Sequence, residues 1–155
     1  MRIQDILQKN AVIINLEASN KTELLTQMAK YLASLYDIQN PALVIQKIID
    51  REAEMSTGIG FGIAIPHARI ENIDKVFMVA ARSVKGIEFD AIDEQPVHLI
   101  FMMLSPANAS NQYTQILSAL SRIMSYEDIR QSLIETDVAE NFLTIIARGE
   151  DKYVQ

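Results

Sequence analysis

The chain has 155 residues, no cysteine, a formal net charge of −6 at pH 7 and a sequence pI near 4.9. Its composition, 49% hydrophobic and 22% charged, is typical of a globular protein, and its length suits one domain. The acidic balance argues against a nucleic-acid-binding surface, which needs clustered Lys and Arg. Without cysteine, the chain can form no disulfide and carry out no thiol chemistry.

The sequence offers no pattern for a membrane span or a secretion signal. Its longest apolar run, residues 97–104, contains His98 and falls well short of the about 20 apolar residues that a membrane-spanning helix needs. The first five residues, MRIQD, do not lead from a basic start into an apolar signal core. We therefore expect a cytoplasmic protein.

The first third of the chain predicts one strand and two helices. Ala11–Asn15 is a compact apolar run of strand length. Asn20 and Glu23 have the spacing of a capping box, and the apolar residues that follow recur at helical intervals. After Asn40, Pro41 is suited to the first position of a second helix.

Residues 56–67 form the most unusual stretch, because three glycines alternate with two large apolar residues before an Ile-Pro-His segment. Two apolar runs downstream, residues 76–81 and 97–104, predict buried strands. Three further helices are expected: one around apolar positions 116–124, one capped by Ser125 and ending near Ile134, and one from Asp137 to about Ala147. The alternation predicts an α/β single-domain sandwich, a mixed β-sheet flanked by helices on both faces.

Common catalytic and binding motifs are absent from the sequence. The two histidines, without cysteine or a His-Glu-x-x-His pair, indicate no metal site. The glycines match neither the dinucleotide fingerprint nor the phosphate loop of nucleotide hydrolases. No serine lies in a Gly-x-Ser-x-Gly elbow. His98, inside an apolar strand, is assigned no role.

His67 is the residue that could carry chemistry. Pro66 fixes its own φ and favours an extended Ile65, so His67 should follow a stiff strand-like segment. Neutral imidazole is a good nucleophile near pH 7, since its pKa is about 6.5. The preceding glycines leave backbone N–H groups accessible, as in an anion nest.

Four polar residues near His67 in sequence, Arg51, Ser56, Thr57 and Arg69, can donate hydrogen bonds to phosphate oxygens. These groups would suit a phosphoryl group carried on nitrogen. The residues alone are equally compatible with a turn histidine and with glycines that only allow bends.

Residues 52–68, and above all the segment GFGIAIPHA at 60–68, resemble the active-site signature of a known family. They are similar to the enzyme IIA domains of the bacterial phosphoenolpyruvate-dependent phosphotransferase system, of the fructose–mannitol type that includes nitrogen-regulatory members. The resemblance runs from about residue 3 to residue 149, which we take as the domain. Residues 150–155 would then be a C-terminal tail.

The resemblance implies a mechanism. His67 would accept a phosphoryl group from the phosphocarrier HPr, carry it on Nε2 and pass it to a IIB domain, which serves a membrane IIC permease. Arg51 matches the family's arginine beside the imidazole, and Ser56 and Thr57 match its loop. No cofactor is implied, because the phosphoryl group arrives already activated.

Docking of HPr should need an apolar patch, for which Ile59, Phe61 and Ile63 are candidates. Packing in the core is the alternative, favoured more for Ile63 than for Phe61. The family's second active-site histidine aligns with Tyr113, whose hydroxyl can hydrogen-bond phosphate but cannot become cationic. We therefore expect weaker or slower phosphotransfer than in members with two histidines.

Two other functions are compatible with the same residues. A regulatory protein of the nitrogen-regulatory type would be phosphorylated at His67 but act by binding other proteins. A degenerate relative would bind partners without carrying phosphate, a reading that Tyr113 favours and that the intact Arg51, Thr57 and His67 oppose.

Overall fold

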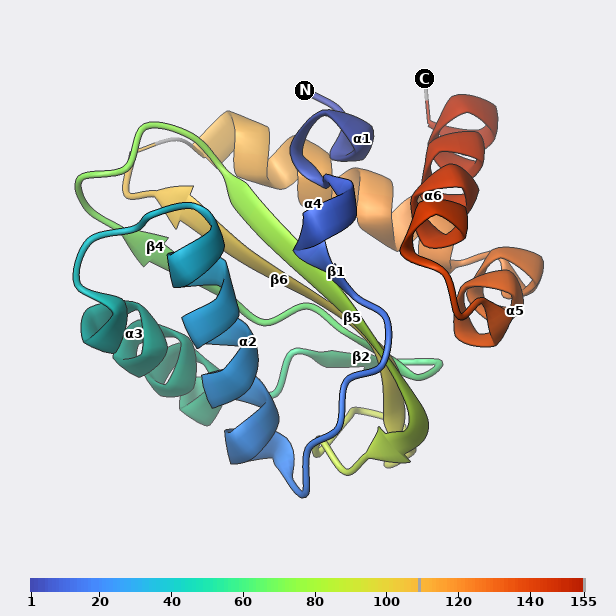
Figure 1. The fold of residues 1–155 in the computed structure, drawn as a ribbon, viewed down its shortest axis with the longest axis horizontal. Helices are drawn as coiled ribbons and strands as arrows, with labels where there is room; N and C mark the ends of the chain where they lie inside the picture. Colours follow the sequence, from blue (N-terminus) through green and yellow to red (C-terminus); the bar gives the residue numbers. More distant parts are fainter. Residues whose placement is uncertain (109, 155) are drawn as a thin grey trace.

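The computed structural model describes residues 1–108 and 110–154, and it confirms the expected α/β sandwich. A mixed sheet lies between α2 and α3 on one side and α4, α5 and α6 on the other (Figure 1). The helices are α1 (Ile3–Ile6), α2 (Lys21–Leu35), α3 (Pro41–Glu54), α4 (Ser110–Met124), α5 (Glu127–Glu135) and α6 (Ala139–Tyr153), with a 3-10 turn at Lys9–Ala11. Among the described residues, none of these helices is long and apolar enough to cross a lipid bilayer.

The sheet contains six strands: β1 (Val12–Ile13), β2 (Gly58–Gly60), β3 (Ile63–Ala64), β4 (His67–Ile70), β5 (Phe77–Ile87) and β6 (Val97–Pro106). Their order is β1-β5-β6-β3-β2, and β4 also pairs with β6. The β1–β5, β3–β6 and β4–β6 pairs are parallel, whereas β5–β6 and β2–β3 are antiparallel. The sheet is therefore mixed, as predicted.

Strands β3 and β4 both pair with β6, one after the other along its length. Ile63 lies opposite Leu99 and His67 lies opposite Met103. The gap between β3 and β4 is Ile65 and Pro66, and Pro66 has no N–H to donate to a ladder. This interruption places His67 at the start of β4, at the end of a stiff segment as the sequence predicted.

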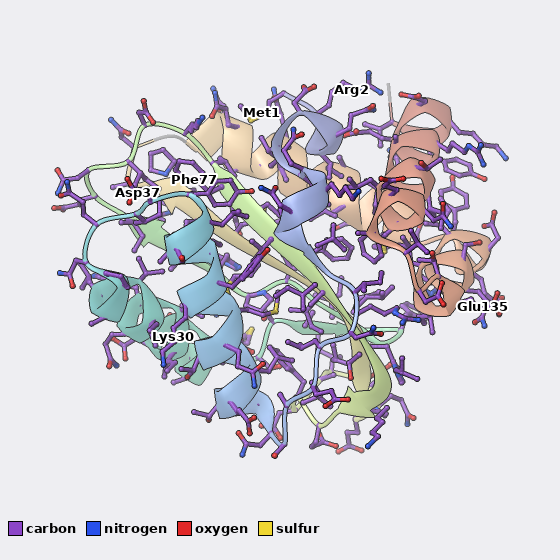
Figure 2. All side chains as sticks on the ribbon, in the orientation of Figure 1. Met1, Arg2, Lys30, Asp37, Phe77 and Glu135 are labelled. Carbon is purple, nitrogen blue, oxygen red and sulfur yellow. The ribbon has the colours of Figure 1, made fainter. Side chains whose placement is uncertain are left out.

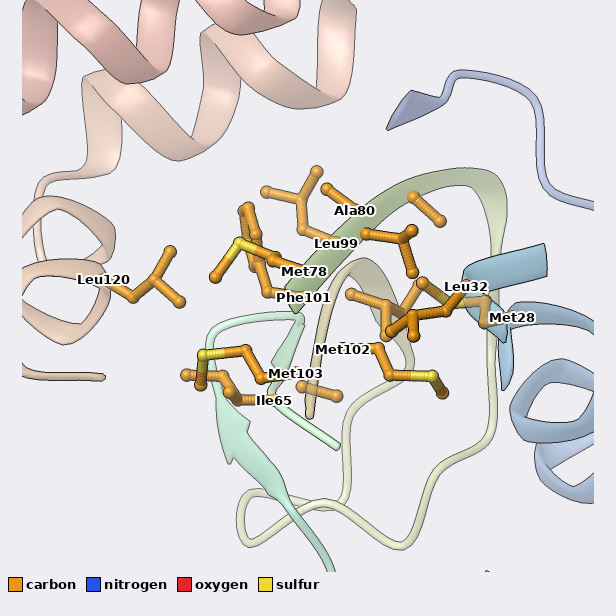
Figure 3. Packing of buried hydrophobic residues seen from close by; sticks show 14 of the residues in the cluster. Met28, Leu32, Ile65, Met78, Ala80, Leu99, Phe101, Met102, Met103 and Leu120 are labelled. Atoms are coloured by element: carbon orange, nitrogen blue, oxygen red, sulfur yellow. The ribbon is translucent and has the colours of Figure 1, made fainter. Parts of the chain in front are cut away.

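The core fills both sides of the sheet. Figure 3 shows Leu120 of α4 on one side of the central strands and Met28 and Leu32 of α2 on the other. These side chains and those of the central strands are fully buried, as the apolar helical spacing predicts. Charged side chains such as Lys30, Asp37 and Glu135 lie at the periphery (Figure 2).

The predicted N-cap at Asn20 is confirmed, whereas the reciprocal bond of a capping box is shifted by one residue. The Asn20 side chain accepts a hydrogen bond from the backbone N–H of Glu23 at 2.9 Å, and α2 begins directly after it. The Glu23 carboxylate accepts from the N–H of Ser19 at 3.1 Å, one residue earlier than a capping box requires. Pro41 is the first residue of α3, as expected, and Asn40 caps that helix.

Two helix boundaries differ from the prediction. Ser125 does not cap α5, which begins after Tyr126, because its hydroxyl donates to the carbonyl of Arg122 at 2.6 Å. The last helix, expected to end near Ala147, continues to Tyr153. Residues 150–153, expected as part of a tail, are therefore the last turn of α6.

Candidate functional site

A cavity of about 540 Å³ opens between α3, β4, the end of β6 and α4. Helix α3 supplies four charged side chains, and the two strands and α4 supply the others. The lining residues are Lys47, Asp50, Arg51, Glu54, His67, Ala68, Arg69, Ser105 and Tyr113. The fold thus brings together four of the residues that the sequence analysis selected, His67, Arg51, Arg69 and Tyr113.

The His67 ring is held in one tautomer. Its Nδ1 lies 2.9 Å from the carbonyl oxygen of Ile65. A carbonyl oxygen can only accept a hydrogen bond, so Nδ1 must carry the proton. In the neutral ring, Nε2 then keeps its lone pair and is the nucleophilic atom.

The cavity also favours the neutral form of His67. Partial burial lowers the pKa of its imidazole, because the cationic form loses hydration. The Ile65 carbonyl and Glu52 raise this pKa, while Arg51 and Arg69 lower it, and the net direction is downward. The His67 imidazole is therefore neutral at physiological pH.

Arg51 and Tyr113 lie beside the imidazole. Arg51 is in the last turn of α3, where its Nη1 donates to the Met55 carbonyl at 2.9 Å, a favourable place for a cation. The Tyr113 ring centroid is 5.2 Å from that of His67. Burial raises the pKa of Tyr113, so its hydroxyl stays protonated at pH 7 and remains a hydrogen-bond donor.

Ser56 and Thr57 are not brought to the cavity. The Ser56 hydroxyl donates to the carbonyl of Phe89 at 2.9 Å. The Thr57 hydroxyl is buried and donates to Glu52 at 2.6 Å. Both hydroxyls have partners within the protein, so the structure gives no support to the direct phosphate contacts expected for them.

The glycine-rich stretch forms the β2–β3 hairpin rather than an anion nest at His67. Gly60 and Gly62 have φ values of +99° and +79°, which the tight turn requires and which glycine adopts without strain. Among the described residues, no glycine lines the cavity. Turn geometry thus explains Gly60 and Gly62, while Gly58 allows a close approach, because a Cβ there would lie 2.8 Å from Cβ of Ala91.

The predicted docking residues Ile59 and Phe61 belong to this hairpin. Their side chains are exposed, 42% and 70%, while Ile63 is buried as the alternative reading foresaw. The guanidinium of Arg130, in α5, lies over the Phe61 ring, with its Cζ atom 4.6 Å from the ring centroid. Neither Ile59 nor Phe61 lines the His67 cavity, so their part in docking stays a prediction.

Comparison with known proteins decides the family. Residues 5–149 match the family described as phosphoenolpyruvate-dependent sugar phosphotransferase system, EIIA 2. The chain belongs to this family. A fructose-specific EIIA component of the phosphotransferase system from Haloferax volcanii is 43% identical over 103 residues, which cover 66% of this chain and 67% of that protein.

Two solved structures of EIIA proteins share the fold. The nitrogen regulatory protein IIA-Ntr from Neisseria meningitidis superposes with a TM-score of 0.88 and 32% identity, covering 93% of this chain and 98% of that one. Enzyme IIA-Mtl from Escherichia coli, solved in complex with phosphorylated enzyme IIB-Mtl, gives a TM-score of 0.76 at 19% identity, covering 92% and 99%. The second likeness shows the fold alone.

Sequence reasoning missed several residues that line this EIIA cavity. Lys47, Asp50 and Glu54 follow one another on α3 at the three- and four-residue intervals that place side chains on one helix face, together with Arg51. That spacing is visible in the sequence and could have identified them. Ser105 carries no comparable local signal, since only the β4–β6 register brings it there.

Other features of this EIIA chain lie outside the cavity. The Nδ1 of His98 donates to the carbonyl of Ser83 at 2.9 Å, between β5 and β6, and His98 does not line the cavity. Within the described part of the chain, no three His, Asp or Glu side chains gather as metal ligands would.

Proposed function

We propose that this EIIA chain is a phosphocarrier that accepts a phosphoryl group on Nε2 of His67 from phosphorylated HPr and passes it to a IIB domain. The observation that carries the proposal is the 2.9 Å hydrogen bond from His67 Nδ1 to the Ile65 carbonyl, which leaves Nε2 free. Lys47, Arg51 and Arg69 supply positive charge around the same cavity. Phosphoryl transfer depends mainly on positioning and electrostatic stabilisation, which these groups can provide.

The transfer needs no additional base. The Nε2 lone pair attacks the phosphorus of the donor phosphohistidine, and the donor N–P bond breaks with its electron pair returning to the donor nitrogen. The His67 ring becomes cationic because it keeps its Nδ1 proton. The Ile65 carbonyl then accepts a charge-assisted hydrogen bond, which is stronger than the bond to the neutral ring.

Coupled sugar uptake is the first proposed output. It is supported by the fructose-specific name of the Haloferax relative. The phosphoryl group would pass from IIB to sugar entering through a membrane IIC permease, with the EIIA step in the cytoplasm. Regulation of the nitrogen-regulatory type is the second proposed output. It is favoured by the 32% identity to IIA-Ntr over almost the full length of both chains.

Intact-mass measurement tests the phosphocarrier proposal. The protein is mixed with enzyme I, HPr, magnesium and phosphoenolpyruvate, beside His67→Ala and His98→Gln variants. An acid-labile gain of one phosphoryl group in wild type and His98→Gln, absent in His67→Ala, is expected. No gain in folded wild type with active HPr would instead identify a degenerate binding module.

A second stage separates the two outputs. The purified phosphoprotein is offered candidate fructose- and mannitol-type IIB domains, and loss of its phosphoryl group is followed by mass. Rapid loss to a IIB domain supports sugar uptake. A stable phosphoprotein whose phosphorylation changes its binding to other proteins supports regulation.

A further inference from the structure

We infer that Glu52 is a positioning residue, which holds His67 in the tautomer and place from which Nε2 can be phosphorylated. The inference rests on the phosphocarrier function proposed above. Its physical content, the state of the His67 ring, can nevertheless be measured without any phosphoryl donor. Glu52 itself touches no reacting atom. Besides its charge, which raises the pKa of His67, it acts through two backbone segments.

Glu52 is the anchor of a buried cluster behind the cavity. Its carboxylate, on a residue only 5% exposed, accepts the backbone N–H of Thr57 at 2.7 Å and the Thr57 hydroxyl at 2.6 Å. Lys21 Nζ, from the start of α2, pairs with the same carboxylate at 2.9 Å. Three groups from two other segments thus converge on one side chain of α3.

A continuous series of hydrogen bonds leads from this cluster to the nucleophile. The carbonyl of Thr57 accepts the backbone N–H of Ile65 at 3.0 Å. The carbonyl of Ile65 in turn accepts the Nδ1 proton of His67 at 2.9 Å. Because each bond uses a different peptide group, the series transmits position rather than charge.

The gap in the sheet makes this support necessary. Ile65 lies between β3 and β4, where neither strand includes it, and its N–H bonds to Thr57. The Thr57 segment therefore orients the Ile65 N–H, while the carbonyl of the next residue, Pro66, accepts the N–H of Met103 at 2.9 Å. If Thr57 moves, the Ile65 carbonyl that fixes the His67 tautomer moves with it.

Stability alone does not explain the buried ion pair between Lys21 and Glu52. Buried ion pairs often contribute no more stability than apolar side chains of similar size. Lys21 is also the first residue of α2, where the helix macrodipole disfavours a cation. A need to fix Thr57, and through it His67, accounts for both charges at these positions.

The test uses Glu52→Gln, which keeps the side-chain shape but removes the charge, and Thr57→Val, which removes only the hydroxyl. Long-range ¹H–¹⁵N NMR of the neutral protein reports which His67 nitrogen is protonated. His98, whose Nδ1 has an equivalent carbonyl partner at 2.9 Å, is an internal reference in the same spectrum. Glu150→Gln is the matched control, because Glu150 is the other buried glutamate and lies outside the described cavity lining.

In wild type, we expect a single Nδ1-protonated form of His67. In Glu52→Gln we expect a mixture of tautomers and a phosphoryl acceptance rate lower by about tenfold or more, since misplacement of a reacting group by 1 Å can cost about a hundredfold. Thr57→Val should shift both in the same direction by less. His98 signals, and the His67 ring in Glu150→Gln, should be unchanged.

Wild-type ring signals in folded Glu52→Gln and Thr57→Val, with acceptance rates within twofold of wild type, would overturn the inference. If Glu52→Gln does not fold, Thr57→Val decides alone. Altered tautomers in a protein that HPr never phosphorylates would uphold the positioning and refute the phosphocarrier function. Normal phosphorylation, with tautomers unaltered in the variants, would refute the positioning role of Glu52 and uphold the phosphocarrier function.

Discussion

Removing the Glu150 carboxylate should destabilise the whole domain, although this residue is the sixth from the end of the sequence. Glu150 is 1% exposed and accepts the backbone N–H of Ile3 at 2.5 Å, the backbone N–H of Gln4 at 3.2 Å and the Gln4 amide at 3.0 Å. It thereby fastens α1 to α6. In Glu150→Ala, the N–H of the fully buried Ile3 loses its acceptor.

The size of the effect follows from these contacts. A buried donor left unsatisfied costs about 1–3 kcal/mol, and loss of the other bonds to a charged acceptor brings the total to about 2–4 kcal/mol. For a domain of this length, each kcal/mol lowers Tm by about 2–4 °C, so a fall of roughly 4–16 °C is expected. Urea unfolding should show a lower midpoint with an unchanged m-value.

Asp151→Ala is the matched control. The Asp151 carboxylate is exposed and pairs with Arg2, and exposed pairs contribute little to stability. The unfolding midpoint of Asp151→Ala should equal that of wild type. A chain truncated after Gly149 should instead have a lowered midpoint, like that of Glu150→Ala. A wild-type midpoint for Glu150→Ala would refute the reasoning and would support residues 150–155 as a dispensable tail.

Three predictions concern the cavity. Since burial, Arg51 and Arg69 lower the pKa of His67 from its usual value of about 6.5, the rate of phosphoryl acceptance should fall at low pH with a midpoint below 6.5. A stopped-flow pH series with a midpoint at or above 6.5 contradicts this. Met55 and Phe61 are each 70% exposed, but only Met55 is bonded to Arg51 of the cavity, through its carbonyl. Met55→Asp should therefore raise the KM for HPr more than Phe61→Asp does. Equal effects of the two variants would place the β2–β3 hairpin within the docking surface. Tyr113→His should speed acceptance or lengthen the phosphohistidine lifetime, and the weaker-transfer hypothesis fails if neither changes.

The elements of the fold could be predicted because their signals are local. Apolar spacing and the caps at Asn20 and Asn40 depend on residues within one or two turns of each helix. The end of α6 could not be read in this way, since a glycine after Arg148 resembles a helix stop. Gly149 instead allows close packing with α5, because a Cβ there would lie 2.8 Å from Cδ1 of Ile129.

The site was predictable where one segment determines it. The Pro66-His67 pair and its family resemblance identify His67 as the proposed acceptor, and Arg51, which lies nearby in sequence, lines the same cavity. The hydrogen bond from the Thr57 hydroxyl to Glu52 could not be foreseen, because Glu52 is a buried carboxylate and burial of a glutamate has no local signature. A hydroxyl close to His67 in sequence can thus face the opposite side of the loop.

The charges that line the cavity have a further consequence. Three cationic side chains there, Lys47, Arg51 and Arg69, face two carboxylates, Asp50 and Glu54. A phosphoryl group added to neutral His67 contributes at least one net negative charge, which cancels the surplus. The two forms of the protein would then present electrically different faces around an otherwise unchanged shape. A partner that binds by electrostatic complementarity could distinguish the phosphorylated from the unphosphorylated protein without any movement of the backbone.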